Sequence, residues 1–595
     1  MRQSLKDDFE RKIDKLKCFL AQYDTYTVLG YFSNFLTFYI QETFDKTGLS
    51  SPCKEFFYLG GLLLSTEQKD NKHFGKEEFE TVRDLLEEIT KFYALMFFPS
   101  PEEIGSRISE KWLKATEVSM PVFLNYFNTV ILCQPEQLFE RIESWFVPFN
   151  AEIKREHGIS IREIIAIHQF LLSALQDQLN TIQATRQKFQ DEQRDYLNTY
   201  DEQQYTLEQM QSFAEQHPVK DAAIIWYDHL TNVYKFSIKE LKKHFDEQVV
   251  ESFLQIFSLE RAERDFRYYT ENNPFETSPI WKISDEQIFI GFVQMVHYSI
   301  YETITALIEK STFTERFYRN RDHKSEKKTL SIFQNLFGES AEYYPSIYEN
   351  NKSENQHDLL IQYNNNLLVV EIKASKVKAP FRDPEKAFLR IQRDFKSDKG
   401  IQKAYNQGLH LKQLILSQAV TPLYDKKGNR AVTIQKKEVR QIYILCITAE
   451  QLGILAANLS LLLEKPDNEP YPWSCNLFDL ENFVEGLQYT NFPSEAFLDY
   501  LEERARLHKK LYSADELEIA GCYLLYGFDA IKEQYSKADR ITFGRTMSNI
   551  FDKIYFEKKG LAYDFKIGEK PYIFDIREEV LNSIVVDISS PSFNP

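Results

Sequence analysis

The chain has 595 residues, with 89 Asp or Glu against 72 Lys or Arg, so its formal net charge is −17. This charge excludes a uniformly basic nucleic-acid-binding surface, although a local basic groove is compatible with it because affinity for phosphate depends on nearby charge. The six cysteines form no C-x-x-C pair, which argues against a zinc ribbon or a thioredoxin-like site. The N-terminus lacks a signal-peptide pattern, and the longest apolar runs are too short to span a bilayer. We therefore expect a cytoplasmic protein without a membrane partner.

The length predicts three or four domains at roughly 150 residues each. Residues 1–158 predict a helical N-terminal domain, because apolar residues recur at spacings of three and four between polar or proline-containing breaks. Residues 218–311 predict a small mixed α/β connector. In it, Ser237 and Glu240 form a capping-box pattern, and the segments Trp281–Ile283 and Ile288–Ile290 on either side of residues 284–286 predict a hairpin.

Between these regions, residues 159–217 form a coiled-coil-like segment without Gly or Pro before His217. Largely apolar positions recur every seven residues from Leu172 and from Leu175, with polar interruptions. The pattern predicts either one long helix or two helices joined near residues 183–193. We interpret it either as a coiled-coil arm, which would form a homo-oligomer through residues 160–216 or sense a target, or as a helical hairpin packed on its own domain.

The central region, residues 312–450, contains the most informative pattern. Asp358 begins a short apolar run, Asn364-Asn365-Asn366 predicts a turn, and a second apolar run ends in Glu371-Ile-Lys373. In a hairpin, Asp358 would lie close to Glu371, and Lys373 would lie on the same side as Glu371 because strand side chains alternate. Paired carboxylates suit Mg²⁺, and the lysine can orient a water or neutralise charge on a phosphate.

Elements before and after this hairpin complete a recognisable order. A helix containing Glu326 ends at Gly338, a helix with Lys403 and Gln407 on one face follows, and residues 441–448 predict a buried strand. The segment from Glu371 to Lys412 holds eleven Lys or Arg against five Asp or Glu.

In this order of elements and in Gln356-x-Asp358 followed by Glu371-Ile-Lys373, the chain resembles the PD-(D/E)XK (restriction-endonuclease-like) nuclease superfamily, in its Mrr/RecB-like branch, within a larger bacterial nuclease-related protein. The resemblance implies a two-layer α/β core, Mg²⁺ (or Mn²⁺) held by Asp358, Glu371 and Glu326, and Lys373 near the attacking water. Glu339 and Glu342 are the alternatives for the third carboxylate. No Pro precedes Asp358, and the later helix lacks the strict Q-x-x-x-Y pattern of RecB-like nucleases. The residues expected to contact nucleic acid are Lys376, Lys378, Lys403 and Gln407.

Residues 451–595 predict a helical C-terminal domain, so the expected fold is a multidomain α+β protein with a restriction-endonuclease-like core between helical regions. The expected function is metal-dependent hydrolysis of phosphodiester bonds in DNA, as a regulated nuclease of a bacterial anti-phage defence system. RNA fits the same motif, because a metal-held phosphate does not distinguish the sugars. The chain has no P-loop, so any ATPase or sensor would be a separate subunit. The alternatives are a catalytically silent nucleic-acid-binding module and a helical scaffold subunit of a larger complex.

Overall fold

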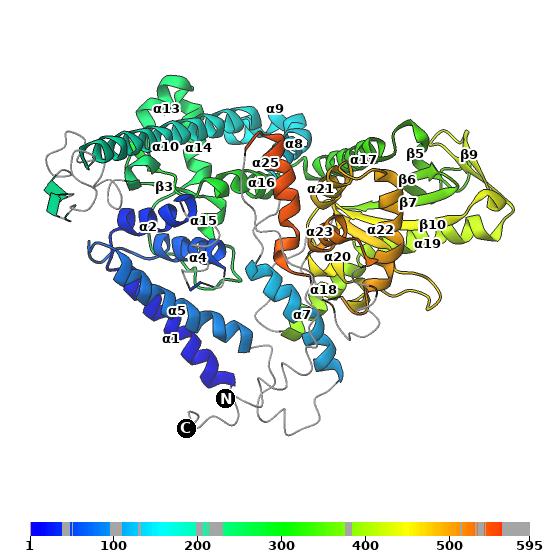
Figure 1. The fold of residues 1–595 in the computed structure, drawn as a ribbon, viewed down its shortest axis with the longest axis horizontal. Helices are drawn as coiled ribbons and strands as arrows, with labels where there is room; N and C mark the ends of the chain where they lie inside the picture. Colours follow the sequence, from blue (N-terminus) through cyan, green and yellow to red (C-terminus); the bar gives the residue numbers. More distant parts are fainter. Residues whose placement is uncertain are drawn as a thin grey trace. The chain divides into compact units, whose positions relative to one another are not determined.

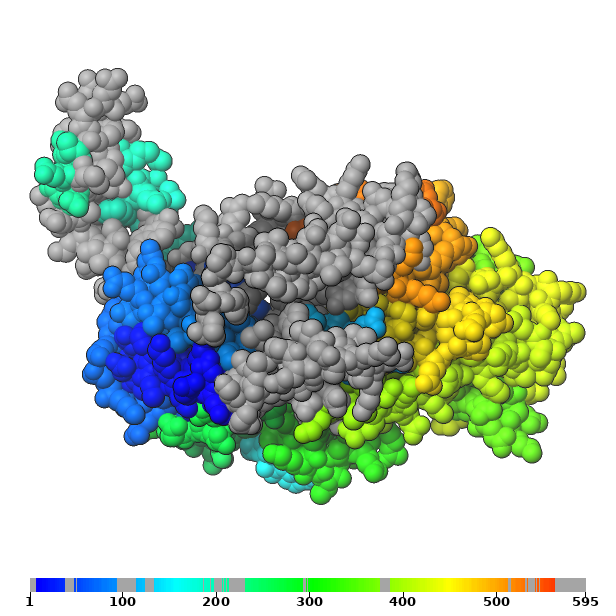
Figure 2. All heavy atoms as spheres, turned by 90° about the horizontal axis from the view of Figure 1, so that it is seen from below, coloured from blue at the N-terminus to red at the C-terminus, as the bar shows by residue number. Residues whose placement is uncertain are grey.

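The computed structural model describes residues 2–38, 48–49, 51–95, 110–128, 133–197, 206, 208–209, 211–212, 230–374, 384–511, 515–529, 532, 541 and 543–561. The remaining residues are drawn in grey in Figures 1 and 2. The fold is mixed α+β with two mixed sheets, which confirms the predicted class. The chain divides into two compact units: unit 1 is Met1–Gly105 with Gln134–Phe317, and unit 2 is Ser106–Cys133 with Tyr318–Pro595.

Unit 1 is mainly helical. Among the described residues, its longer helices include α1 (Arg2–Leu20), α2 (Thr25–Phe38), α4 (Pro52–Leu64), α5 (Lys76–Leu95), α8 (Pro135–Phe146), α9 (Asn150–His157), α10 (Ile161–Leu197), α13 (Ile238–His244), α14 (Glu247–Phe257) and α16 (Val293–Glu309). Aromatic rings fill the core between the first helices, for example Phe32 against Phe56, with centroids 5.1 Å apart. These rings are packing residues, because both side chains are fully buried.

A small four-stranded sheet completes unit 1. Its order is β1 (Lys235–Ser237), β4 (Gln287–Phe289), β3 (Ile280–Lys282) and β2 (Ser258–Leu259). The predicted hairpin is confirmed, since Trp281 pairs with Phe289 in an antiparallel register. The predicted helix start is also confirmed, because the Ser237 side chain accepts a hydrogen bond from the Glu240 N–H.

The coiled-coil-like segment begins as α10, one continuous helix of 37 residues that runs through positions 183–193. Its first half packs on α9 and α16 within unit 1 and buries Ile164, Ile167 and Leu171. This part of the helix therefore has its apolar face covered by its own unit. Most of the segment beyond Leu197 lies outside the described residues.

Unit 2 is built on a seven-stranded sheet with the order β11-β10-β7-β6-β5-β8-β9. The strands are β5 (Ala341–Tyr348), β6 (Gln356–Tyr363), β7 (Asn366–Lys373), β8 (Val420–Tyr424), β9 (Arg430–Gln435), β10 (Gln441–Thr448) and β11 (Trp473–Asn476). β5, β6 and β7 form an antiparallel meander, and β10 runs parallel to β7 along its whole length. A parallel neighbour needs a crossover, and α19 (Ile401–Ser417) provides it. Gly408 lets α19 lie close to the sheet, because a Cβ there would be only 2.7 Å from the Ile444 side chain.

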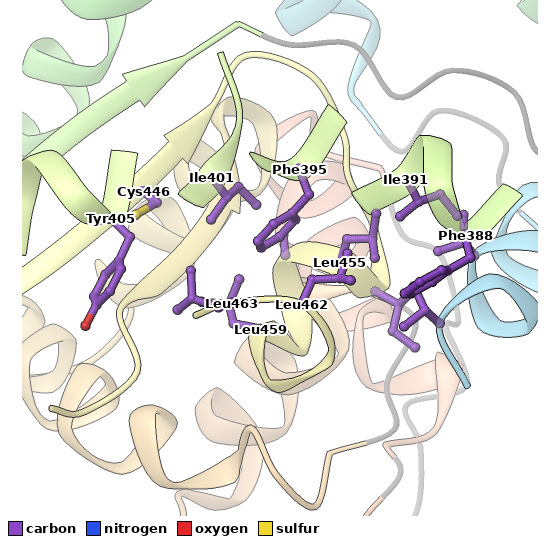
Figure 3. Packing of buried hydrophobic residues seen from close by; sticks show 14 of the residues in the cluster. Phe388, Ile391, Phe395, Ile401, Tyr405, Cys446, Leu455, Leu459, Leu462 and Leu463 are labelled. Atoms are coloured by element: carbon purple, nitrogen blue, oxygen red, sulfur yellow. The ribbon is translucent and has the colours of Figure 1, made fainter. Parts of the chain in front are cut away.

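A hydrophobic core of unit 2 joins α18 (Pro384–Lys396) and α19 to residues 454–463. Figure 3 shows Phe388, Ile391 and Phe395 of α18 directed toward the leucines of that segment. Helix α7 (Glu110–Asn128) contributes Ala115, Val118 and Val122 to the same core. The region predicted as one N-terminal domain, residues 1–158, is thus shared between the two units.

Replacing Val118 with Asp should destabilise unit 2 by about 4 kcal/mol or more, because the new carboxylate would be buried in an apolar core. Val118 is 1% exposed and packs in the core that contains α18. The matched substitution Lys114→Asp places the same charge on an exposed position of α7 and should leave stability nearly unchanged. Thermal unfolding and protease protection of residues 384–396 measure both variants. Equal effects would show that α7 does not belong to this core.

The C-terminal part of unit 2 contains α21 (Leu477–Leu487), α22 (Pro493–Leu507), α23 (Glu516–Tyr526) and α25 (Asn549–Lys558). The prediction of helices is confirmed for these described residues, but β11 was not predicted. It pairs in parallel with β10, so the sheet extends past the predicted domain boundary at residue 450. Arg504 of α22, 0% exposed, connects this helix to α23 through hydrogen bonds to both carboxylate oxygens of Glu516, and it also donates to the Ala457 carbonyl.

Asp515 caps α23 by accepting a hydrogen bond from the Glu518 N–H. Burial, assisted by repulsion from Glu516 and opposed by that hydrogen bond, raises the pKa of Asp515 from 3.8 to about 6. The unfolded chain loses this proton first as pH rises from about 4 to about 6, so the contribution of Asp515 to stability falls across that window. Asp515→Asn keeps a capping oxygen and should stabilise the protein at pH 7 by roughly 2–3 kcal/mol, with no gain at pH 4. Urea midpoints of both proteins across this range test the prediction, and a constant difference between them would contradict it.

Candidate active site

The predicted hairpin is present, formed by β6 and β7 (Figure 1). Its turn uses Asn364 and Asn365 with φ of 44° and 63°, a left-handed conformation that Asn tolerates better than most residues. Backbone pairing extends to Leu359 opposite Val370. Asp358 and Glu371 are the next residues on the two strands, at the point where this pairing ends.

Asp358, Glu371 and Lys373 converge at this sheet end, as predicted. Lys373 Nζ lies 3.9 Å from Asp358 Oδ2 and 3.8 Å from Glu371 Oε2. The Ile372 N–H donates to Asp358 Oδ2 at 2.7 Å, which fixes this carboxylate across the end of the hairpin. Burial raises the pKa of both acids, and the Lys373 ammonium opposes that rise in each case. Lys373 thus places a positive charge beside both of these largely desolvated carboxylates.

The proposed third carboxylate, Glu326, lies on α17 (Thr314–Phe337). Its pKa is raised to about 7, first by burial and then by repulsion from Asp358 and Asp322. Asp322 is one helical turn earlier on α17 and also raises the pKa of Asp358. Glu326 therefore shares the electrostatic environment of the hairpin acids, although no hydrogen bond joins it to them among the described contacts.

The alternative third carboxylates lie elsewhere. Glu339 is exposed in a short 3-10 turn after α17. Glu342 is exposed on β5, pairs across the strand with Gln362, and accepts a hydrogen bond from Tyr344. Gln362 is four residues along β6 from Asp358, which places Glu342 well along the strand from the acids. Among these three candidates, Glu326 is the one whose pKa is raised by the hairpin acids Asp358 and Glu371.

His357 was not predicted as a site residue, yet it contacts Glu371 directly. Its Nδ1 lies 2.7 Å from Glu371 Oε1, and its Nε2 lies 3.0 Å from Glu349 Oε1. Burial lowers the pKa of His357, but the two hydrogen-bonded carboxylates outweigh burial and raise this pKa to about 9. The imidazole is therefore protonated at neutral pH. In the sequence, the position of His357 next to Asp358 could have indicated a role at the site. The pairing of His357 with Glu349 depends on the fold.

The residues expected to contact nucleic acid are only partly described. Lys403 is exposed on α19. Gln407, one turn further along, has a buried Oε1 without a hydrogen-bond partner in the described structure. Lys376 and Lys378 lie outside the described residues. The placement of Lys403 and Gln407 on one face of α19 agrees with the predicted helical spacing.

The acids fit a hard divalent cation in their donor chemistry. Within the described ranges, no three His, Cys, Asp or Glu side chains converge in a ready metal-binding cluster. However, Glu371 Oε2 is buried and accepts no hydrogen bond, and with Asp358 Oδ2 it faces the same ammonium group. Carboxylate oxygens that are desolvated and lack sufficient donors are the ligands that Mg²⁺ or Mn²⁺ would use. Asp358 and Glu371, with Glu326 as third acid, are therefore the residues that could hold the ion.

The chain matches no family model, no curated protein and no solved structure. Among the described helices, none is by itself both long and apolar enough to cross a membrane. One bent pair of helices, Pro135–His157 with Ile161–Tyr196, reaches the required length and composition only when the two are combined.

Proposed function

We propose that unit 2 carries a metal-dependent nuclease that hydrolyses phosphodiester bonds of DNA. The observation that carries the proposal is the buried Glu371 Oε2, which has no hydrogen bond and faces Lys373 beside Asp358. Such a desolvated acceptor is costly unless a ligand compensates for it, so it points to a site that binds a cation.

The carboxylates and the lysine have different roles in this proposal. Asp358, Glu371 and Glu326 would hold Mg²⁺ or Mn²⁺, which supplies polarisation of a phosphoryl oxygen and a more acidic bound water. The cation would replace Lys373 as the partner of the carboxylates. The Lys373 ammonium would then neutralise charge that develops on the phosphate. The Ile372 N–H keeps Asp358 in position while the ammonium shifts.

The order of elements supports the resemblance to the PD-(D/E)XK superfamily. Helix α17, strands β5 to β7, helix α19 and strand β10 follow one another as the sequence order requires. Helix α19 covers β7 and β10 and so forms a second layer on the sheet that presents the acids.

DNA is the proposed substrate, with RNA as the second candidate, and Lys403 with Gln407 would contact its backbone. We further propose that the helical unit 1 makes cleavage conditional, as in anti-phage defence, with homo-oligomer formation through residues 160–216 or a separate ATPase or sensor subunit as the trigger. These points rest on the large non-catalytic share of the chain.

The test is incubation of the full chain with supercoiled plasmid and, separately, with single-stranded RNA, in Mg²⁺, in Mn²⁺ and with EDTA. Cleavage of plasmid that needs the metal and stops with EDTA supports the proposal. Cleavage of the RNA but not of the plasmid would identify RNA as the substrate. Salt-sensitive binding without cleavage in any condition would contradict the proposal and favour a catalytically silent binding module.

A further inference from the structure

A chain of buried side chains runs behind the proposed metal site. It leads from Glu371 to His357 and on to Glu349, with consecutive contacts of 2.7 and 3.0 Å. The side chains of these three residues are 0%, 2% and 8% exposed, respectively. Both ring nitrogens of His357 face carboxylate oxygens, so the ring cannot rotate without losing at least one of these two contacts.

This contact makes the two oxygens of Glu371 unequal. Oε1 accepts from His357, whereas Oε2 has no hydrogen bond and lies 3.8 Å from Lys373 Nζ. A carboxylate that is free to rotate would exchange these oxygens. His357 prevents this exchange and keeps one particular oxygen directed at the site.

Glu349 is held in turn from two other parts of the fold. Its Oε2 accepts from Asn355 Nδ2 at 2.9 Å, in the loop before β6, and lies 3.1 Å from Nε2 of His410 on α19. Glu349 follows the last residue of β5. The anchor of His357 therefore combines the end of β5, the following loop and the crossover helix, and these are the elements that frame the site.

We propose that His357, held by Glu349, is a positioning residue that aims Glu371 Oε2 at the bound divalent cation. This inference rests on the proposed function, because it needs a metal at Glu371. Partners that orient a metal-binding side chain typically change metal affinity by about ten- to a hundredfold when they are removed. A purely structural ion pair would instead affect folding stability and leave the affinity for metal unchanged.

The experiment measures Mn²⁺ binding to the full chain without nucleic acid, by the electron paramagnetic resonance signal of free Mn²⁺, together with thermal unfolding. For His357→Ala we expect a Mn²⁺ dissociation constant about ten- to a hundredfold higher than in the wild type. Glu349→Gln leaves His357 in place but removes its anchoring charge, and we expect a smaller increase in the same direction. The matched control is His508→Ala, which removes another buried histidine of unit 2 that accepts a hydrogen bond from the Leu459 N–H. It should lower the melting temperature without changing Mn²⁺ affinity.

The outcomes separate this inference from the proposed function. If the wild type binds Mn²⁺ and cuts nucleic acid but His357→Ala and Glu349→Gln bind Mn²⁺ as the wild type does, the positioning role is wrong and the nuclease proposal stands. If the wild type neither binds Mn²⁺ nor cuts, both are wrong. If His357→Ala does not fold, Glu349→Gln decides, since it preserves the volume of the side chain: weaker Mn²⁺ binding supports the inference, and unchanged binding overturns it.

Discussion

Glu371→Gln is expected to reduce the rate of nucleic-acid cleavage by about 10²–10³-fold, because it removes a charged ligand of the proposed metal ion, worth several kcal/mol in the transition state. The glutamine side chain keeps the shape of the buried residue but cannot supply the anionic oxygen that now faces Lys373 at 3.8 Å. Cleavage of plasmid in Mg²⁺ under single-turnover conditions measures the loss. Metal binding should weaken in parallel.

Lys373→Ala should reduce cleavage to a similar extent for a different reason. The ammonium contacts both carboxylates, at 3.9 and 3.8 Å, but it is not itself a metal ligand. We therefore expect this variant to bind Mn²⁺ at least as well as the wild type while it cuts poorly. The control is Glu342→Gln, which neutralises an exposed carboxylate of β5 in the same sheet and should leave cleavage unchanged. If Glu342→Gln reduced the cleavage rate as much as Lys373→Ala does, the rate would depend on the charge of the protein in general and not on this site.

Arg504→Met is expected to destabilise unit 2 by about 3–5 kcal/mol, because it leaves the charge of Glu516 buried without its ionic partner. Glu516 Oε1 would keep the hydrogen bonds from Trp473 Nε1 and Tyr500, at 2.6 and 2.5 Å, but Oε2 would lose its contacts with the guanidinium. The Ala457 carbonyl would also lose its donor. The urea midpoint of the transition of unit 2 measures the effect.

A surface arginine on the same helix provides the comparison. Arg506 has a side chain 57% exposed and pairs with Glu502 and Glu503 at 3.1 and 2.9 Å. Such solvated pairs contribute about 0–1 kcal/mol, so Arg506→Met should shift the midpoint little. Similar shifts for Arg504→Met and Arg506→Met would contradict the structural role of the buried pair.

The sequence was sufficient to predict the features that are formed by residues close to one another in the chain. The turn at Asn364 and Asn365 fixes the pairing of β6 and β7, and strand periodicity then brings Asp358, Glu371 and Lys373 together. The start of α13 after its N-cap residue Ser237 was also predictable, because the capping contact joins Ser237 to Glu240 only three residues later.

Other features depend on pairing between distant segments, which local patterns do not specify. Helix α7 joins the core of α18 across more than two hundred residues, and its apolar face would fit many partners. Strand β11 is short and buried, and it is recognisable as a strand only beside β10. The contact of His357 with Glu349 requires the loop between β5 and β6 to close, and nothing in the spacing of these residues predicts it.

The proposed nuclease places a metal-dependent phosphodiesterase site at Asp358, Glu371 and Lys373. The most direct measurement is plasmid cleavage by the wild type and by Glu371→Gln, each in Mn²⁺ and in EDTA, with Mn²⁺ binding recorded on the same samples. We predict cleavage by the wild type in Mn²⁺ alone, and both weak binding and weak cleavage for Glu371→Gln. Cleavage by Glu371→Gln at the rate of the wild type would show that the chemistry, if this chain performs it, takes place elsewhere.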